Sequence, residues 1–348
     1  MRILHVITTI ERGGAENQLL VLARYQRSEN MDVSVFFLKG GNELEKEFRK
    51  IGVEVIGSYA NHSLLRQLFF LREYTRSKEL VVHAHLPRAE LLCALIKPRG
   101  VFVVSRHNAE SFFPGSPRFI SRLLSRFVSR RASHIIAISN AVSNYLYKSG
   151  EVPPKKHITV ICYGYPVNDT HSQKRKKTYR VGTVSRLVAQ KDLTTLLRGF
   201  QLAQNVNREI VLEIIGEGSE KLNLQSLAKE LRIDSFVKFL GRTDKVDEAM
   251  QGWDLFILTS KYEGFGLVLL EAMSNNTPII ASDSEAAKEV LGQGFPFFFP
   301  IGDFVHLSQH ILQLLTEDTE NLLDYQRERL KEFSPIRMEK AIAELYLG

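Results

Sequence analysis

The sequence predicts an α/β protein with two doubly wound, parallel-sheet domains. Short apolar runs alternate with longer amphipathic segments along the whole chain, an order typical of parallel strands with helices on both faces of a sheet. The alternation starts again after a polar, basic stretch at residues 167–180. The length of 348 residues is long for one domain and comfortable for two.

In the first half, a set of short apolar runs is interpreted as strands. Helical patterns lie between several of them and are clearest at residues 16–28 and 87–97. Together these runs predict a Rossmann-like domain over residues 1–165. The predicted strands cover residues 2–10, 32–40, 53–58, 80–86, 101–107, 134–139 and 157–164.

The second half repeats this organisation and predicts a Rossmann-like domain over residues 166–335, joined to the first near residues 162–178. Residues 336–348 are expected to form a terminal helix that can cross back to the first domain. We expect the two domains to face each other across a cleft. The predicted strands cover residues 179–187, 209–218, 237–241, 255–260 and 277–282, and a helical pattern covers residues 191–203.

Composition places the chain among ordinary globular proteins, with 44% hydrophobic and 24% charged residues. The two cysteines, Cys93 and Cys162, cannot make a disulfide framework, which suits a reducing cytosol. The N-terminal apolar run has no signal-peptide pattern. No stretch approaches the roughly 20 apolar residues that cross a bilayer. We therefore expect a cytoplasmic protein.

The charge is distributed unevenly along the chain. Residues 1–160 contain 24 Lys and Arg against 13 Asp and Glu, whereas residues 181–348 contain 17 against 25. A basic half joined to an acidic half favours two domains, of which the first faces an anionic partner.

The stretch KYEGFGLVLLEA, residues 261–272, follows a predicted strand and enters an apolar helix. Loops in this position bind the ligands of doubly wound sheets. With Glu263 in the loop and Glu271 on the helix, one carboxylate can approach a sugar and the other a ribose. A buried helix with charges at its ends is the alternative. A glutamate in so apolar a helix needs a partner that offsets its loss of hydration, which favours a ligand site.

Other strand ends carry weaker signals. Gly13 and Gly14 precede a helix, where glycine permits close approach of a ligand and helix amides favour an anion, although a tight turn explains them equally well. Arg186 and Lys191 follow the first strand of the second half, where two cations would meet a diphosphate. A solvated basic turn is the alternative there. Gly216 marks a further strand end.

Five segments taken together resemble the retaining group-1 glycosyltransferases, which have the GT-B fold. They occur in the expected order over nearly the whole chain. The two glutamates with seven residues between them, preceded by EGFG, are the most specific part of the resemblance. The segments are GGAEN, VGTVSRLVAQKD, IIGEGSE, VKFLGR and EGFGLVLLEA.

This resemblance implies a donor site. Glu263 would hold hydroxyls of the transferred sugar, Glu271 the ribose hydroxyls, and Arg186 and Lys191 the diphosphate. His107 would lie near the reacting sugar, so that the implied catalytic set is His107, Glu263, Arg186 and Lys191. The further donor-binding residues implied are Gly14, Gly216, Arg242, Phe265, Gly266 and Leu267, with Arg242 beside the nucleobase.

The activity implied is that of a hexosyltransferase that uses a nucleotide-diphosphate sugar, with a UDP-sugar favoured over a GDP-sugar, and retains the anomeric configuration. The implied acceptor is a cell-surface polysaccharide, such as lipopolysaccharide, or a lipid-linked saccharide. No cofactor and no obligatory metal are implied, and no D-x-D pattern occurs in the chain. Fixed cations and oriented amides would stabilise the leaving diphosphate instead. A GT-B sugar-nucleotide epimerase and a non-catalytic nucleotide-sugar-binding partner of a larger assembly remain as alternatives.

At two places the sequence departs from the family pattern. Tyr163 and Gly164 stand where the family often has Asn-Gly before the linker. Phe297, Phe298 and Phe299 stand where it usually has a glycine-rich turn, and we expect a buried strand there.

His83 and His85 point to one face of a predicted strand. Two histidines without a third ligand nearby are more often structural than metal-binding, so no metal site is predicted. The resemblance keeps His85 as a candidate for the acceptor site.

Residues 117–134 combine arginines with large apolar side chains. A helix here would carry an arginine ridge beside an apolar stripe. Either the stripe packs on the sheet, or the helix meets anionic lipid at the inner face of a membrane. The basic first half favours the membrane, and nucleic acid is not expected because no binding motif accompanies the arginines. The ridge consists of Arg118, Arg122, Arg126 and Arg130.

Overall fold

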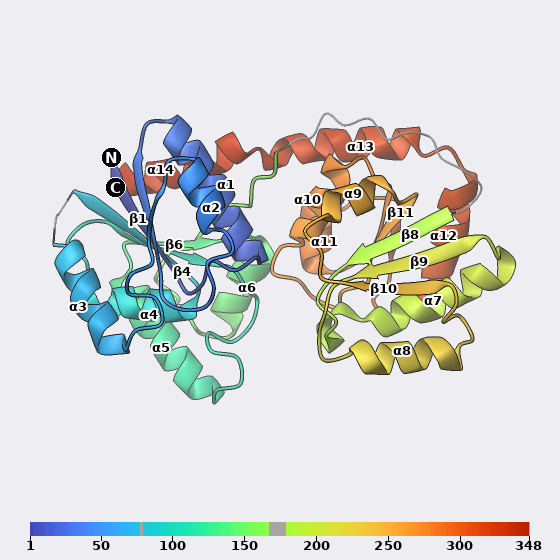
Figure 1. Cartoon of the computed structure of the whole chain (residues 1–348), viewed down its shortest axis with the longest axis horizontal. Coiled ribbons are helices and arrows are strands. Elements are labelled where there is room, and N and C mark those ends of the chain that lie inside the picture. Colours follow the sequence, from blue (N-terminus) through green and yellow to red (C-terminus); the bar gives the residue numbers. More distant parts are fainter. Residues whose placement is uncertain (77–78, 167–178, 348) are drawn as a thin grey trace. The chain divides into compact units, whose positions relative to one another are not determined.

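The computed structural model describes residues 1–76, 79–166 and 179–347. They form two compact α/β units, in agreement with the predicted fold class (Figure 1). The first unit comprises Met1–Gly164 together with Phe333–Gly348, and the second comprises Tyr165–Glu332. Most of the predicted linker, residues 167–178, lies outside the described residues.

The first unit is built on a seven-stranded parallel sheet with the order β3-β2-β1-β4-β5-β6-β7. The central strands are almost entirely buried and mostly apolar on both faces, as expected for a covered parallel sheet, although they also bury histidines. The strands are β1 (Arg2–Ile7), β2 (Asp32–Phe37), β3 (Glu54–Ile56), β4 (Leu80–His85), β5 (Phe102–Arg106), β6 (His134–Ala137) and β7 (Thr159–Val160).

Two groups of helices cover this sheet (Figure 1). On one side α1 packs against α2, α14 and β2; on the other α4 packs against α3, α5, β1 and β4. The helices are α1 (Gly14–Ser28), α2 (Glu45–Lys50), α3 (Leu64–Tyr74), α4 (Pro87–Ile96), α5 (Arg118–Arg131), α6 (Asn140–Lys148) and α14 (Pro335–Leu347).

The second unit has a six-stranded sheet with the order β10-β9-β8-β11-β12-β13. Its strands are β8 (Tyr179–Val184), β9 (Ile210–Ile215), β10 (Val237–Gly241), β11 (Leu255–Leu258), β12 (Ile279–Ser282) and β13 (Phe298–Phe299). Its helices are α7 (Leu193–Val206), α8 (Lys221–Glu230), α9 (Val246–Gln251), α10 (Leu267–Ser274), α11 (Glu285–Leu291), α12 (Phe304–Thr316) and α13 (Glu320–Leu330), with 3-10 turns at Ala189–Lys191 and Lys331–Phe333.

Both sheets reverse their strand order at one place, between β1 and β4 in the first unit and between β8 and β11 in the second. Ligands of doubly wound folds bind outside the carboxyl ends of the strands at such a reversal. The loops after these four strands are therefore the places to look for a functional site.

The chain enters and leaves the first unit at a close backbone contact. The predicted strand at 157–164 is shorter than expected, since only β7 is paired and the chain then runs on to Gly164. A Cβ atom on Gly164 would lie 2.4 Å from the Cα of Pro335, so a glycine is needed where the chain leaves the unit beside the segment by which it returns. The predicted terminal helix forms as α14 and packs on α1.

The expected strand in the phenylalanine run is also present, as β13, with Phe299 fully buried beside β12. Among the described residues, no helix is both long and apolar enough to span a membrane.

Candidate functional site

The strand-order reversal of the second unit brings two predicted loops together. The Thr259 hydroxyl, after β11, donates to the backbone oxygen of Lys191, after β8, at 2.7 Å. The backbone N–H of Lys261 donates to the oxygen of Gln190 at 2.9 Å. These bonds fix the loop after β8 against the loop that leads into α10.

At this junction Lys191 and Glu263 form a direct ion pair. Lys191 Nζ lies 2.5 Å from Glu263 Oε1, and the Ser260 hydroxyl donates to the same oxygen at 2.6 Å. Glu263 is only 9% exposed, so its charge needs this cation and this donor. Two residues of the implied catalytic set therefore meet, and Ser260, which the sequence reasoning missed, joins them.

The loop continues into the N-terminus of α10. Gly266 caps this helix with φ of 92°, a conformation that favours glycine, and Leu267 is its first residue. The first amides of a helix have no acceptor within the helix and favour an anion. Phe265 is buried in this loop, and the amide contacts of Gly266 and Leu267 with a ligand stay a prediction.

Glu271 lies one turn further along α10 and is half-buried. Burial and the negative charge of Asp247 raise the pKa of its carboxyl to about 7. Burial and the charges of Glu271 and Asp247 also raise the pKa of Tyr165. Asn275 links this group, since its amide donates to Asp247 Oδ1 at 2.8 Å and to the Glu271 backbone oxygen at 3.0 Å. A ligand that donates hydrogen bonds to Glu271 would stabilise its ionised carboxylate beside Asp247.

Gly216 packs closely against the loop after β8. Its φ is 134°, and a Cβ atom would lie 1.8 Å from the backbone oxygen of Ser185. Arg186 follows in the same loop and is exposed, as is Arg242 after β10. The structure thus places Gly216 in a supporting role and leaves both arginine side chains at the surface.

In the first unit, the loop after β1 has the predicted glycine turn. Gly13 caps α1, and Gly14 is its first residue. A Cβ atom on Gly14 would meet none of the described atoms within 4 Å, so packing within the chain does not require glycine there. Glu16, part of the GGAEN segment but not singled out from the sequence, is buried, and burial and Glu11 raise its pKa to about 7.

His107 and His85 come together at the ends of β5 and β4. His107 Nε2 lies 3.2 Å from His85 Nδ1, and His107 Nδ1 is hydrogen-bonded to the Tyr163 hydroxyl. Burial and the nearby Arg106 charge lower the pKa of His107 to about 3, so the ring is neutral at physiological pH. His5, which the sequence reasoning missed, completes a cluster with His83 and His85 because β1 pairs with β4 in register.

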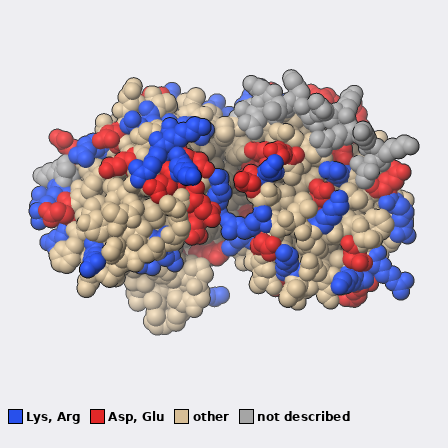
Figure 2. Space-filling view, viewed as in Figure 1, with Lys and Arg blue, Asp and Glu red and all other residues tan. Residues whose placement is uncertain are grey.

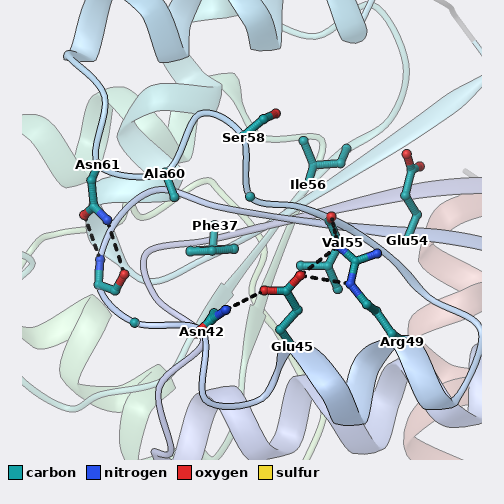
Figure 3. Close-up of a pocket in the computed structure, with 13 residues that line it drawn as sticks. Phe37, Asn42, Glu45, Arg49, Glu54, Val55, Ile56, Ser58, Ala60 and Asn61 are labelled. Atoms are coloured by element: carbon teal, nitrogen blue, oxygen red, sulfur yellow. Dashed lines mark hydrogen bonds and ion pairs between the residues drawn. The ribbon is translucent and has the colours of Figure 1, made fainter.

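A separate surface cavity of about 580 Å³ lies beside the ends of β2 and β3 (Figure 3). Arg49 and Asn42 both donate to the carboxylate of Glu45 there, and Asn61 bonds to Gly40. These polar groups satisfy one another, and no predicted site residue lines the cavity.

The arginine ridge lies on α5, but the helix does not pack as one alternative required. Its buried face consists of Ser121, Ser125, Val128 and Ser129. Phe119 and Leu123 are 66% and 64% exposed instead. The apolar residues at the start of α5 therefore face outward, beside Arg118 and Arg122.

Comparison with known proteins covers nearly the whole chain. Residues 167–334 match the family model described as glycosyl transferases group 1, and residues 12–169 match that described as glycosyltransferase family 4. The N-acetyl-alpha-D-glucosaminyl L-malate synthase of Bacillus anthracis is 26% identical over 76% of this chain and 72% of its own length. The amylovoran biosynthesis glycosyltransferase AmsD of Erwinia amylovora is 24% identical over 78% of this chain and 77% of its own.

Solved structures share the fold. Anabaena HepE in complex with UDP-glucose superimposes with a TM-score of 0.81 at 21% identity, over 99% of this chain and 98% of that one. The pneumococcal O-GlcNAc transferase GtfA in complex with UDP and GlcNAc has a TM-score of 0.80 at 13% identity, over 100% of this chain and 98% of that one.

Proposed function

The chain belongs to the group-1 glycosyltransferases and has their GT-B fold, and we propose that it transfers a hexose from a UDP-sugar to a saccharide acceptor with retention of anomeric configuration. In this reaction the bond between the sugar C1 and the phosphate oxygen breaks. A bond from C1 to an acceptor hydroxyl oxygen forms, and the hydroxyl proton leaves with the diphosphate or to solvent.

The observation that carries the proposal is the junction of Lys191, Glu263 and the N-terminus of α10. Negative charge develops on the diphosphate as the C1–O bond breaks, and a fixed cation with oriented amides stabilises it. Glu263, held by Lys191 and Ser260, offers an acceptor to sugar hydroxyls. Arg186 and Gly14 would complete the contacts with the diphosphate.

UDP is preferred as the donor nucleotide because HepE and GtfA were solved with UDP. We assign Glu271 to the ribose hydroxyls and Arg242 to the nucleobase. Titration calorimetry with UDP, GDP, ADP and CMP tests this assignment on the wild type, on Glu271→Ala and on Glu230→Ala. Glu230 is an exposed residue at the end of α8 and serves as the matched control.

Tight binding of UDP that weakens at least tenfold in Glu271→Ala, and not in Glu230→Ala, supports both the donor and the ribose contact. Tight binding of GDP instead of UDP would mean that the donor is a GDP-sugar, bound at the same proposed site. If the folded protein binds none of the four nucleotides, the family fold is present without the proposed activity.

We also propose that transfer needs no obligatory metal, because Lys191, Arg186 and the helix amides supply the positive charge. Turnover that persists at full rate in excess EDTA is the expected result. Proton NMR of the product gives the anomeric configuration directly: an α-linked donor should yield an α-linked product. An inverted product contradicts the retaining mechanism and leaves donor binding intact.

For the acceptor, we propose a lipid-linked or cell-surface saccharide reached at an anionic membrane surface. The exposed start of α5 supports this, with apolar residues outward and arginines alongside, which fits the interface of anionic lipid. Figure 2 shows little charge on the visible surface at the lower end of this unit, where α5 lies in Figure 1. On α3, which packs against α4 as α5 does, Leu65 and Phe69 are also exposed.

Liposome sedimentation tests the membrane surface with vesicles of phosphatidylcholine alone or mixed with phosphatidylglycerol. The wild type should bind only the anionic vesicles, and the double substitution Phe119→Ser with Leu123→Ser should abolish binding. Val206→Ser removes an equally exposed apolar side chain from the second unit and should change nothing. Binding that ignores lipid charge would count against this surface.

A further inference from the structure

A continuous chain of hydrogen bonds runs through the interior of the first unit. It joins His107 to His85 at 3.2 Å, His85 to His5 at 3.0 Å, and His5 to the side-chain oxygen of Gln26 at 2.8 Å. The Gln26 amide then donates to Tyr346 on α14 at 3.2 Å. The Tyr346 hydroxyl lies 2.6 Å from His83, and His83 lies 2.7 Å from the Ser105 hydroxyl, where the hydrogen-bond chain ends. At the opposite end, the Tyr163 hydroxyl is bonded to His107.

Each imidazole in this chain uses both ring nitrogens, so one fixed proton determines the others. Because the Gln26 oxygen can only accept, His5 carries its proton on Nε2 and accepts at Nδ1. His85 must then donate from Nε2, which leaves its Nδ1 to accept from Nε2 of His107.

The same reasoning fixes both ends of the chain. His107 Nδ1 can only accept, so the Tyr163 hydroxyl donates to it. On the other side the Gln26 amide donates to the Tyr346 oxygen, and among the described residues the acceptor within reach of the Tyr346 hydroxyl proton is His83 Nδ1. His83 then donates from Nε2 to Ser105. All four imidazoles thus carry the proton on Nε2, and every hydrogen bond points the same way.

The surroundings keep these rings neutral. Burial lowers the pKa of His5 to about 4, and it lowers the pKa values of His83 and His85 well below the ordinary value. The charged groups nearest the chain are Arg106 beside His107, Glu16 beside Tyr163 and Glu339 beside Tyr346. Arg106 disfavours an imidazolium, and the two carboxylates act on the phenols of Tyr163 and Tyr346.

A buried metal at His5, His83 and His85 is the competing interpretation, because their ring nitrogens lie within 4.8 Å of one another. Those nitrogens already bond to Gln26, His107, Tyr346 and Ser105. A divalent ion would break several of these bonds, and the group contains no carboxylate that balances its charge. The hydrogen-bonded arrangement is therefore favoured.

We propose that Gln26 is a positioning residue that sets the tautomer of His107 through His5 and His85, so that His107 meets the sugar as a fixed neutral ring with its N–H turned inward. Tyr346 takes part by accepting from the Gln26 amide, which holds the Gln26 oxygen toward His5. The tautomers follow from the hydrogen bonds alone, whereas their effect on catalysis rests on the proposed function. A terminal helix, α14, thereby contributes to the orientation of a site residue.

Nitrogen-15 NMR of histidine-labelled protein reads the tautomers directly, since long-range couplings separate Nε2–H, Nδ1–H and imidazolium forms. We expect His5, His83, His85 and His107 to be Nε2–H and unchanged between pH 8 and pH 5. Any of the four as Nδ1–H, as a mixture or as imidazolium would overturn the proposal. Stoichiometric binding of Zn²⁺ that is lost in His83→Gln would also overturn it.

The substitution Gln26→Glu gives a result that a purely structural role would not produce. An ionised carboxylate accepts from both neighbours, so the Tyr346 hydroxyl turns toward it and its oxygen must accept from His83. His83 should change to Nδ1–H, while the other three keep Nε2–H. If His83 keeps its Nε2–H tautomer in the folded variant, the proposed hydrogen-bond chain is wrong. If this variant does not fold, Tyr346→Phe serves instead. It removes the donor to His83 Nδ1, so that His83 should be the one histidine of the four with mixed tautomers.

Kinetics test the link to catalysis separately. Gln26→Met, which removes the acceptor for His5, should lower kcat about tenfold and leave the KM for the donor within about twofold, because it disturbs orientation rather than donor contacts. If the tautomers are fixed but the protein turns over no donor, the hydrogen-bond chain is supported and the proposed function is contradicted. Equal kcat in Gln26→Met and wild type would remove the positioning role alone.

Discussion

Lys191 Nζ and Glu263 Oε1 lie 2.5 Å apart although 72 residues separate them in the chain. They meet because β8 and β11 are neighbours in the sheet while other elements intervene in the sequence. Each is nearly buried, with 13% and 9% of the side chain exposed, so either charge would be destabilising if it were left without the other.

Replacing Lys191 with methionine should therefore affect stability and activity together. Loss of the cation leaves Glu263 buried with Ser260 as its remaining donor, and we expect a loss on the order of 2 kcal/mol in unfolding free energy. We expect kcat to fall by about 100-fold to 1000-fold, since a fixed charge beside the leaving group is lost. Urea unfolding and steady-state kinetics measure the two effects. Lys261→Met, which removes an exposed lysine from the loop that carries Glu263, is the control and should change either quantity little.

The raised pKa of Glu271 predicts a pH-dependent stability. The folded protein keeps a proton on this carboxyl up to a pH of about 7, whereas the unfolded chain releases it near the ordinary value of 4.5. The contribution of this group to stability is thus present below about pH 4.5 and is lost as the pH rises through 7. Glu271→Gln should stabilise the nucleotide-free protein at pH 8 by on the order of 1 to 3 kcal/mol and change it little at pH 4.5.

Chemical denaturation of Glu271→Gln and wild type at these two pH values makes that comparison. A constant difference at both would show that Glu271 ionises normally. Ribose hydroxyls donate best to an ionised carboxylate, so nucleotide affinity of the wild type should also rise between pH 6 and pH 8.

Gly14→Ala separates a ligand contact from a folding requirement. Open space surrounds the position of the added Cβ atom, so thermal stability should stay the same or rise slightly. If the diphosphate approaches this glycine as proposed, the donor KM should rise at least fivefold. Unchanged kinetics in a stable variant would remove Gly14 from the donor site.

Gly216→Ala should behave in the opposite way. The new Cβ atom would lie 1.8 Å from a backbone oxygen, and residues with a side chain rarely adopt a φ of 134°. We therefore expect the free energy of unfolding to fall by more than about 3 kcal/mol. Gly302→Ala, also at positive φ but in open space, isolates the backbone cost and should lose about 1 kcal/mol. Equal losses in denaturant titrations would mean that the loop after β8 moves aside.

The fold class follows from the sequence because each element carries its own pattern. A buried parallel strand is continuously apolar, and a surface helix has its own period, so β1, β4 and α1 are recognisable without knowledge of their neighbours. The EGFG loop and the helix start at Leu267 are local features of the same kind.

What the sequence did not predict depends on distant neighbours. Asp247 acquires its importance only because α9 lies beside Glu271 of α10. Ser260 is a local exception, since it lies three residues before Glu263 in the same loop. His5 looks like any polar residue in a strand until β4 places His83 opposite it. On α5, the period left open whether the large apolar side chains pack on the sheet or meet lipid. The buried face consists mainly of the small residues Ser121, Ser125 and Ser129, a choice that depends on the neighbouring elements.

The second unit interrupts the first in sequence, since Tyr165–Glu332 stands between Gly164 and Phe333. During synthesis, therefore, the second unit leaves the ribosome entirely before α14 is available to the first. Until then Gln26 and His83 lack Tyr346, and α1 lacks the helix that packs on it. Although it starts first, the N-terminal unit is therefore completed last, and the hydrogen bonds of its interior histidines are closed only once the second unit has been made.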